Sequence, residues 1–126
     1  MSYVMFNPNP NGLYVGDCTV RAISKITGQD WDTTYIAIAV NGFMLKDMPS
    51  SNHVWGSYLK SKGYHRYVLP DTCPDCYSVK DFCYDNPTGK FILATGTHVI
   101  AAEDGDYYDS WDSGDEAIVY FWTKEG

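Results

Sequence analysis

In the first two thirds of the chain, apolar side chains recur at the spacing of helices, and helix-breaking residues separate these helical segments. Each predicted helix begins at a residue that can cap a helix N-terminus, and glycine or proline follows its last turn. Residues 1–16 contain Asn-Pro-Asn-Pro and predict an irregular lead into the first helix. The predicted helices run from Cys18 to Gly28, from the Asp30 cap to near Gly42, from a Ser51 or Asn52 cap to Gly63, and from Ser78 to Tyr84, with a short strand over 64–69.

After residue 90 the apolar positions alternate, which indicates strands. Asp104-Gly105 predicts a hairpin, because this dipeptide adopts the positive φ angles that a tight hairpin turn requires. The predicted strands cover residues 90–95, 97–102, 107–111 and 117–122. Helices followed by an antiparallel sheet predict an α+β fold. The chain has 126 residues, the length of one domain, which we take to be 1–126.

Composition and charge narrow the class of protein. Hydrophobic residues make up 44% of the chain and aromatic residues 16%, a composition that argues against a disordered or fibrous protein. A formal net charge of −7 argues against binding to nucleic acid or to an anionic membrane, and favours a basic or neutral substrate. The sequence has no signal-peptide pattern and no apolar stretch of membrane-spanning length. We therefore expect a cytoplasmic protein with reduced thiols.

Cys18 begins the first predicted helix, directly after Gly16-Asp17. The unpaired N–H groups and the positive dipole end of a helix N-terminus favour a thiolate over a thiol. The thiolate is the reactive form of cysteine. A late histidine, His98, lies on a predicted strand of the sheet. An early Cys on a helix and a late His on a sheet are typical of a cysteine-nucleophile site that distant segments assemble.

The predicted hairpin supplies a carboxylate for His98. A two-residue turn at Asp104-Gly105 places residue 111 opposite His98, so Asp109 is a diagonal neighbour on the same face of the returning strand. Its carboxylate would hold one imidazole nitrogen and leave the other for Cys18. We favour Asp109, with Asp112 as the alternative if the turn is longer or a bulge intervenes.

Acyl transfer also requires donors for the developing oxyanion. The backbone N–H of Cys18 is one candidate, since it lies at the helix start. Side-chain amides a few residues upstream provide the second, and we expect Asn11, with Asn9 as the alternative. Both asparagines are also ordinary turn formers in a Pro-rich loop.

The remaining cysteines point to no cofactor. Cys73, Cys76 and Cys83 supply three zinc ligands where four are usual, and acidic neighbours of the Cys-x-x-Cys pair oppose thiolate formation. We expect structural thiols, with zinc binding and a disulfide or redox role as alternatives. The aspartates around residue 105 lack the spacing of a calcium-binding EF-hand loop. We expect no bound metal and no other cofactor.

Two segments carry a resemblance to a known family. Gly-Asp-Cys-Thr-Val-Arg-Ala-Ile around Cys18, and Thr-His-Val-Ile around His98 with its Asp-Gly hairpin, resemble papain-like cysteine peptidases. The nearest of these are the bacteriocin-leader (double-glycine) peptidases, whose nucleophile also follows an Asp. The whole chain is also similar to a family of small proteins from bacteriophages and gut Firmicutes. These share Asn-Pro-Asn-Pro, Leu-Pro-Asp-Thr-Cys-Pro-Asp-Cys and Asp-Gly-Asp-Tyr-Tyr-Asp-Ser-Trp-Asp-Ser-Gly, and imply no activity by themselves.

The peptidase resemblance implies a papain-like fold with Cys18 as nucleophile, His98 as general base and acid, and Asp109 as the orienting group. Papain-like enzymes carry a Gln shortly before the nucleophile, at the position that Gly12 occupies here, and Asn11 precedes it. The leading hypothesis is a small thiol hydrolase that cleaves a peptide or isopeptide bond in a peptide or protein substrate. The alternatives are an acyltransferase that uses the same three residues, and a catalytically silent phage-type module that masks a host protein.

Overall fold

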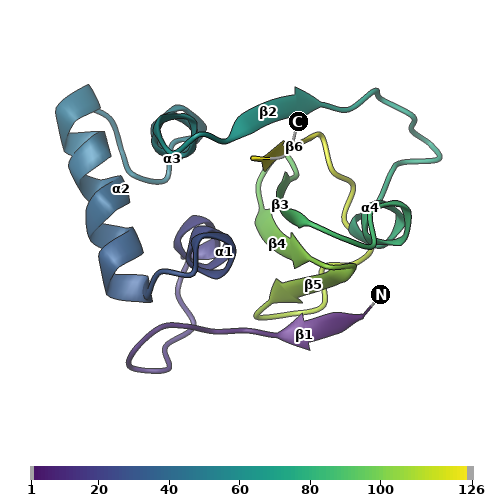
Figure 1. Ribbon diagram of the computed structural model, residues 1–126, viewed down its shortest axis with the longest axis horizontal. Helices are drawn as coiled ribbons and strands as arrows, with labels where there is room; N and C mark the ends of the chain where they lie inside the picture. Colours follow the sequence, from purple (N-terminus) through teal and green to yellow (C-terminus); the bar gives the residue numbers. More distant parts are fainter. Residues whose placement is uncertain (1, 125–126) are drawn as a thin grey trace.

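The structure is a computed structural model that describes residues 2–124, and it confirms the mixed α+β class. This part of the chain holds four helices and one six-stranded sheet (Figure 1). The elements in chain order are β1 (Tyr3–Met5), α1 (Cys18–Thr27), α2 (Trp31–Leu45), α3 (Asn52–Ser61), β2 (His65–Val68), α4 (Val79–Asp85), β3 (Lys90–Ala94), β4 (Val99–Glu103), β5 (Asp106–Asp109) and β6 (Tyr120–Thr123).

The sheet has the strand order β1-β5-β4-β3-β6-β2, and every pairing is antiparallel except that of β1 with β5. The expectation of an irregular N-terminal segment is wrong at residues 3–5, which pair in parallel with β5 and place Met5 opposite Asp109. A three-residue strand is too short for its period to be recognised in sequence, so only the distant pairing partner defines it.

The β4–β5 hairpin forms at the predicted dipeptide. Asp104 and Gly105 both have positive φ angles, 51° and 84°. This geometry fits a two-residue hairpin turn, whose twist matches that of the strands. The hairpin pairs Ala101 with Tyr108 and Ala102 with Tyr107. Continuing this register places Asp109 opposite Ile100 and Trp111 opposite His98.

Helices cover both faces of the sheet (Figure 1). The alternation along β3 sends Ile92 toward a core shared with α1, α2 and α3, and Leu93 toward a second core under α4. Both side chains are fully buried. At roughly 25 cal/mol per Å² of apolar area removed from water, burial on both faces stabilises this central strand. The sheet is therefore a rigid support for the residues at its strand ends.

Helix α2 is apolar on both its inner and its outer side. Thr34, Ile38 and Gly42 are buried, whereas Ile36 and Phe43 are 61% and 69% exposed. Among residues 2–124, neither α2 nor any other helix combines the length and the apolar character needed to cross a membrane.

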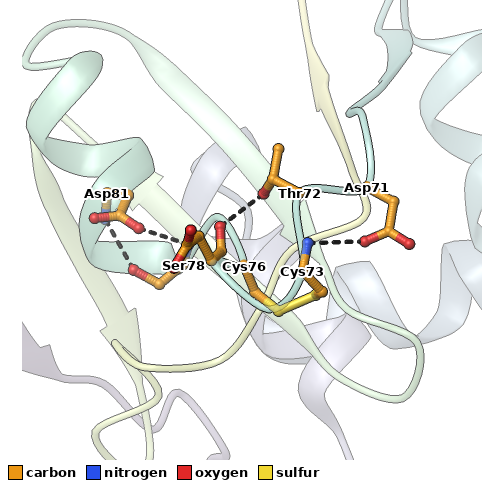
Figure 2. The surroundings of a disulfide bond; sticks show 7 residues. Asp71, Thr72, Cys73, Cys76, Ser78 and Asp81 are labelled. Carbon is orange, nitrogen blue, oxygen red and sulfur yellow. Dashed lines mark hydrogen bonds between the residues drawn. A yellow bond between two sulfur atoms is a disulfide. The ribbon is translucent and has the colours of Figure 1, made fainter.

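The Cys-x-x-Cys segment forms a disulfide between Cys73 and Cys76 in the loop before α4 (Figure 2). The expectation of reduced structural thiols is therefore wrong for this pair, because the turn brings the two side chains into contact. The Cys73 N–H donates to the Asp71 carboxylate at 3.1 Å, and α4 then begins at a capping box formed by Ser78 and Asp81. Cys83 is a free, buried thiol.

Candidate functional site

Cys18 is the first residue of α1, as predicted. Asp17 precedes it at the N-cap position, but its carboxylate makes no cap hydrogen bond. That carboxylate instead accepts from Arg21 Nη1 at 2.7 Å and from Trp31 Nε1 at 2.9 Å. The first N–H groups of α1 therefore lack the usual side-chain acceptor, and the Cys18 thiol lies among them.

His98 lies one residue before β4, at the end of the turn that joins β3 to β4. The prediction of a strand position is therefore wrong by one residue. Thr95 holds this turn, because its N–H donates to the His98 carbonyl and its hydroxyl accepts from the His98 N–H, both at 2.8 Å. These bonds fix the backbone from which the imidazole extends.

Asp109 is the carboxylate that contacts His98, with 2.7 Å between Nε2 and Oδ2. The contact follows from the register, since Asp109 lies two positions from the residue opposite His98. Asp112, the alternative, accepts hydrogen bonds from the Tyr107 hydroxyl and the Gly114 N–H instead. The hairpin has neither the longer turn nor the bulge that would bring Asp112 to His98.

Cys18 and His98 line the same pocket, and each side chain shifts the pKa of the other. Because Asp109 occupies Nε2, the imidazole nitrogen left for the thiol is Nδ1. Burial raises the pKa of Cys18, but hydrogen bonds from His98 and from the Val99 backbone, with the charges of His98 and Arg21, bring this pKa below its ordinary value. Burial likewise opposes protonation of His98, yet its bonds to Asp109 and Cys18 raise the His98 pKa to about 9. Both directions favour a thiolate–imidazolium pair.

The Asp109 carboxylate is fully buried and accepts four hydrogen bonds. Its Oδ2 accepts from His98 and from the Ser113 hydroxyl, at 2.7 Å each. Its Oδ1 accepts from Arg21 Nη2 at 2.9 Å and from the Ser110 N–H at 2.8 Å. Burial by itself raises the pKa of Asp109, but these donors and the His98 charge hold the pKa below its ordinary value. The carboxylate is therefore a fixed anion that orients the imidazole.

Sequence reasoning missed Arg21, which links both buried carboxylates, Asp17 and Asp109. One signal was available: Asp17 and Arg21 are four residues apart, the spacing of an ion pair on one helix face. An arginine between the apolar residues of a short helix is also a sign of a buried partner. The partner itself, Asp109, is 88 residues away and could not be identified from spacing.

The Trp111 indole packs against the His98 imidazole. The ring centroids of His98 and Trp111 are 5.0 Å apart, and Trp111 remains 46% exposed. The hairpin register explains the contact, because it places the two residues opposite each other. An indole beside the imidazole limits the access of water to the ring, which strengthens the hydrogen bond that the ring makes.

Cys18 and His98 line a pocket of about 620 Å³, a volume suited to a ligand of several residues or a small molecule. Asn11 and Asn9 lie outside its lining. They form an exposed turn in which the Asn9 carboxamide accepts from the Asn11 N–H at 2.9 Å. The structure therefore does not bring the expected oxyanion donor to the site, because the Pro-rich loop folds on itself.

One side-chain amide among the described residues does line this pocket, that of Asn52 at the start of α3. Its Oδ1 accepts from Trp55 Nε1 at 3.1 Å. Indole nitrogen only donates, so this bond defines the orientation of the amide and leaves its Nδ2 hydrogens available. Asn52 was predicted only as a helix cap, because nothing local relates α3 to Cys18.

Within residues 2–124, no group of three or more His, Cys, Asp and Glu side chains is arranged to hold a metal ion. A comparison of the chain with protein-family models, curated proteins and solved structures found no match.

Proposed function

We propose that the protein is a small cysteine hydrolase of papain-like type that cleaves peptide or isopeptide bonds. The observation that carries this proposal is the placement of Cys18 and His98 in one pocket, with the thiol on a helix N-terminus and Asp109 hydrogen-bonded to the far side of the imidazole. A structural cysteine needs neither a histidine partner nor a lowered pKa. A buried aspartate behind the histidine is the third element of this class of site.

In the proposed reaction, Cys18 Sγ attacks the carbonyl carbon of the substrate and forms a tetrahedral adduct. The carbon–nitrogen bond then breaks, and His98 Nδ1 gives its proton to the leaving amine. Water next attacks the thioester while Nδ1 accepts a proton from it. The carbon–sulfur bond then breaks, which releases the carboxylic acid and restores the Cys18 thiolate and the His98 imidazolium. Asp109 stays ionised throughout and keeps Nδ1 directed at Cys18.

Two donors are available for the oxyanion of the adduct. The backbone N–H of Cys18 is at the first helical position, where no intrahelical acceptor exists. The Asn52 amide, which also lines the pocket, supplies the second donor in this proposal. Removal of one such donor typically slows turnover by about 100-fold or more.

The test of the proposal is the rate of Cys18 alkylation by iodoacetamide as a function of pH, followed by intact mass. Cys73 and Cys76 are joined in a disulfide, and burial raises the pKa of Cys83 to about 11, so Cys18 should be the thiol that reacts. We expect rapid labelling that persists below about pH 7 and is lost in His98→Ala. His65→Ala is the matched control, because His65 is exposed on β2.

An ordinary thiol profile that is the same in His98→Ala would refute the activated site and favour the catalytically silent binding module. If the thiol is activated, a peptide library digested by the wild type and by Cys18→Ala would reveal the cleaved bonds by mass spectrometry. Added amines such as glycinamide distinguish hydrolysis from acyl transfer, because a transferase would yield the amide product.

A further inference from the structure

A second pocket, of about 540 Å³, lies between α3 and the β6–β2 edge of the sheet. Two of its lining side chains are cationic, Lys60 and Arg66, and the His53 side chain also lines it. Tyr120 supplies an aromatic surface beside them, and the Arg66 guanidinium lies 5.1 Å from the centre of that ring. An arginine stacked on a ring keeps its donors in a defined plane, which suits a carboxylate. We call this pocket the basic groove.

The basic groove has the opposite charge to the protein as a whole, whose formal net charge is −7. No Asp or Glu is among the residues that line it. Within residues 2–124, no ion pair joins Lys60 or Arg66 to another side chain. Uncompensated cations gathered in a concave site attract an anionic ligand.

The basic groove adjoins the pocket that holds Cys18. Asn52 lines both pockets, at the start of α3, and Lys60 lies eight residues further along the same helix. At 1.5 Å per residue, eight helical residues span about 12 Å. Extended peptide advances about 3.3 Å per residue, so the same length corresponds to three or four substrate residues.

We propose that the basic groove binds an acidic side chain of a peptide substrate, three or four residues from the bond that Cys18 attacks. This inference rests on the proposed function, because it treats both pockets as parts of one peptide-binding cleft. It replaces the expectation from net charge of a basic or neutral substrate. The net charge sums the whole surface, whereas the substrate meets the local field of the cleft.

The experiment uses alkylating peptides that differ only in the charge of a distant residue. Iodoacetyl-Ala-Ala-Ala-Glu-amide carries its acidic residue on one side of the reacting carbon, and acetyl-Glu-Ala-Ala-Ala chloromethyl ketone carries it on the other. In each case Cys18 Sγ displaces the halide and forms a thioether. Gln and Lys replace Glu in the comparison probes.

We expect the Glu probe to label Cys18 about fivefold faster than the Gln probe in one of the two orientations, at low ionic strength. The preference should disappear in Lys60→Gln/Arg66→Gln and near 0.5 M salt, where charges are screened. Lys62→Gln is the matched control, since Lys62 follows α3 but does not line the groove. Moving Glu next to the reactive group should also abolish the preference.

Equal rates for Glu, Gln and Lys probes in both orientations would overturn the inference. Iodoacetamide has no peptide tail, so its dependence on His98 reports on the proposed function alone. Loss of that dependence refutes the hydrolase, whereas loss of the Glu preference with that dependence intact refutes only the acidic-peptide site.

Discussion

The thiolate–imidazolium pair makes a specific prediction about stability and pH when Cys18 is replaced by alanine. His98 has a folded-state pKa of about 9 against an ordinary 6.5. This difference corresponds to about 3 kcal/mol of stabilisation of the protonated ring. Because the folded pKa is the higher one, this stabilisation is complete below pH 6.5 and is lost as the pH rises through about 9.

Cys18 contributes a pH dependence of stability with the opposite sign to that of His98. Its folded-state pKa is below the ordinary 9.0, so its stabilisation is complete above pH 9.0 and is lost as the pH falls through the folded pKa. At a pH that lies above both 6.5 and the folded pKa of Cys18, and below about 9, the folded wild type holds one proton on His98, and the unfolded chain holds one on the Cys18 thiol. The two contributions therefore offset each other, and the pair adds almost no pH dependence in this window.

In Cys18→Ala the contribution of the thiol is absent, so nothing offsets the pH dependence that His98 contributes. Asp109 is the strongest of the groups that raise the His98 pKa, so the ring remains more basic than in the unfolded chain. We expect the free energy of unfolding to fall by about 1.4 kcal/mol per pH unit above pH 6.5, and by about 1–3 kcal/mol in total relative to wild type.

The assay is urea unfolding, followed by tryptophan fluorescence, of wild type and Cys18→Ala from pH 6 to 9. The difference between the two curves removes the groups that they share. Cys83→Ala is the matched control: burial raises the pKa of Cys83 to about 11, against an ordinary 9.0, so the thiol stays protonated in both the folded and the unfolded chain below about pH 8. Its removal should therefore leave the pH dependence unchanged from pH 6 to about 8. A difference curve for Cys18→Ala that is flat from pH 6.5 to 9 would refute the ion pair.

Three further predictions follow from single contacts. Arg21→Ala should lower the free energy of unfolding by about 3–5 kcal/mol, because it leaves two buried carboxylates without their cation; a loss below about 1 kcal/mol in urea titration would contradict this. Asn52→Ala should reduce turnover of a cleaved peptide by about 100-fold while iodoacetamide labels Cys18 at the wild-type rate; equal turnover would eliminate the amide as an oxyanion donor. In denaturant without reductant, a thiol reagent should detect two of the four cysteines, Cys18 and Cys83, and all four after reduction; four thiols before reduction would show that the disulfide is absent.

Local signals in the sequence were sufficient to predict most of the helices and strands. The helix start at Cys18 and the hairpin turn at Asp104-Gly105 depend on capping and turn preferences that act over a few residues. The turn also fixed the register, and with it the choice of Asp109 over Asp112 as the residue beside His98. These features were predictable because sequence neighbours determine them.

The features that were missed depend on contacts between distant segments. The partner of Arg21 and the pocket position of Asn52 appear only when α1 and α3 pack against the sheet. Asn11 illustrates the converse: its distance from Cys18 in sequence favoured a role in the site, but a local turn directs it to solvent. The basic groove could not be predicted from the sequence, because its cations come from two separate elements, α3 and β2.

The two-residue turn at Asp104-Gly105 makes the site sensitive to the length of a turn that contains none of its residues. One inserted residue in this turn, with the β4–β5 pairing shifted to match, would bring Tyr108 or Ser110 opposite Ile100 in place of Asp109. His98 would then lose its carboxylate although every residue of the site is still present. Insertions and deletions in this turn should therefore abolish the site unless a β-bulge restores the register, so homologues that keep it should keep the turn length.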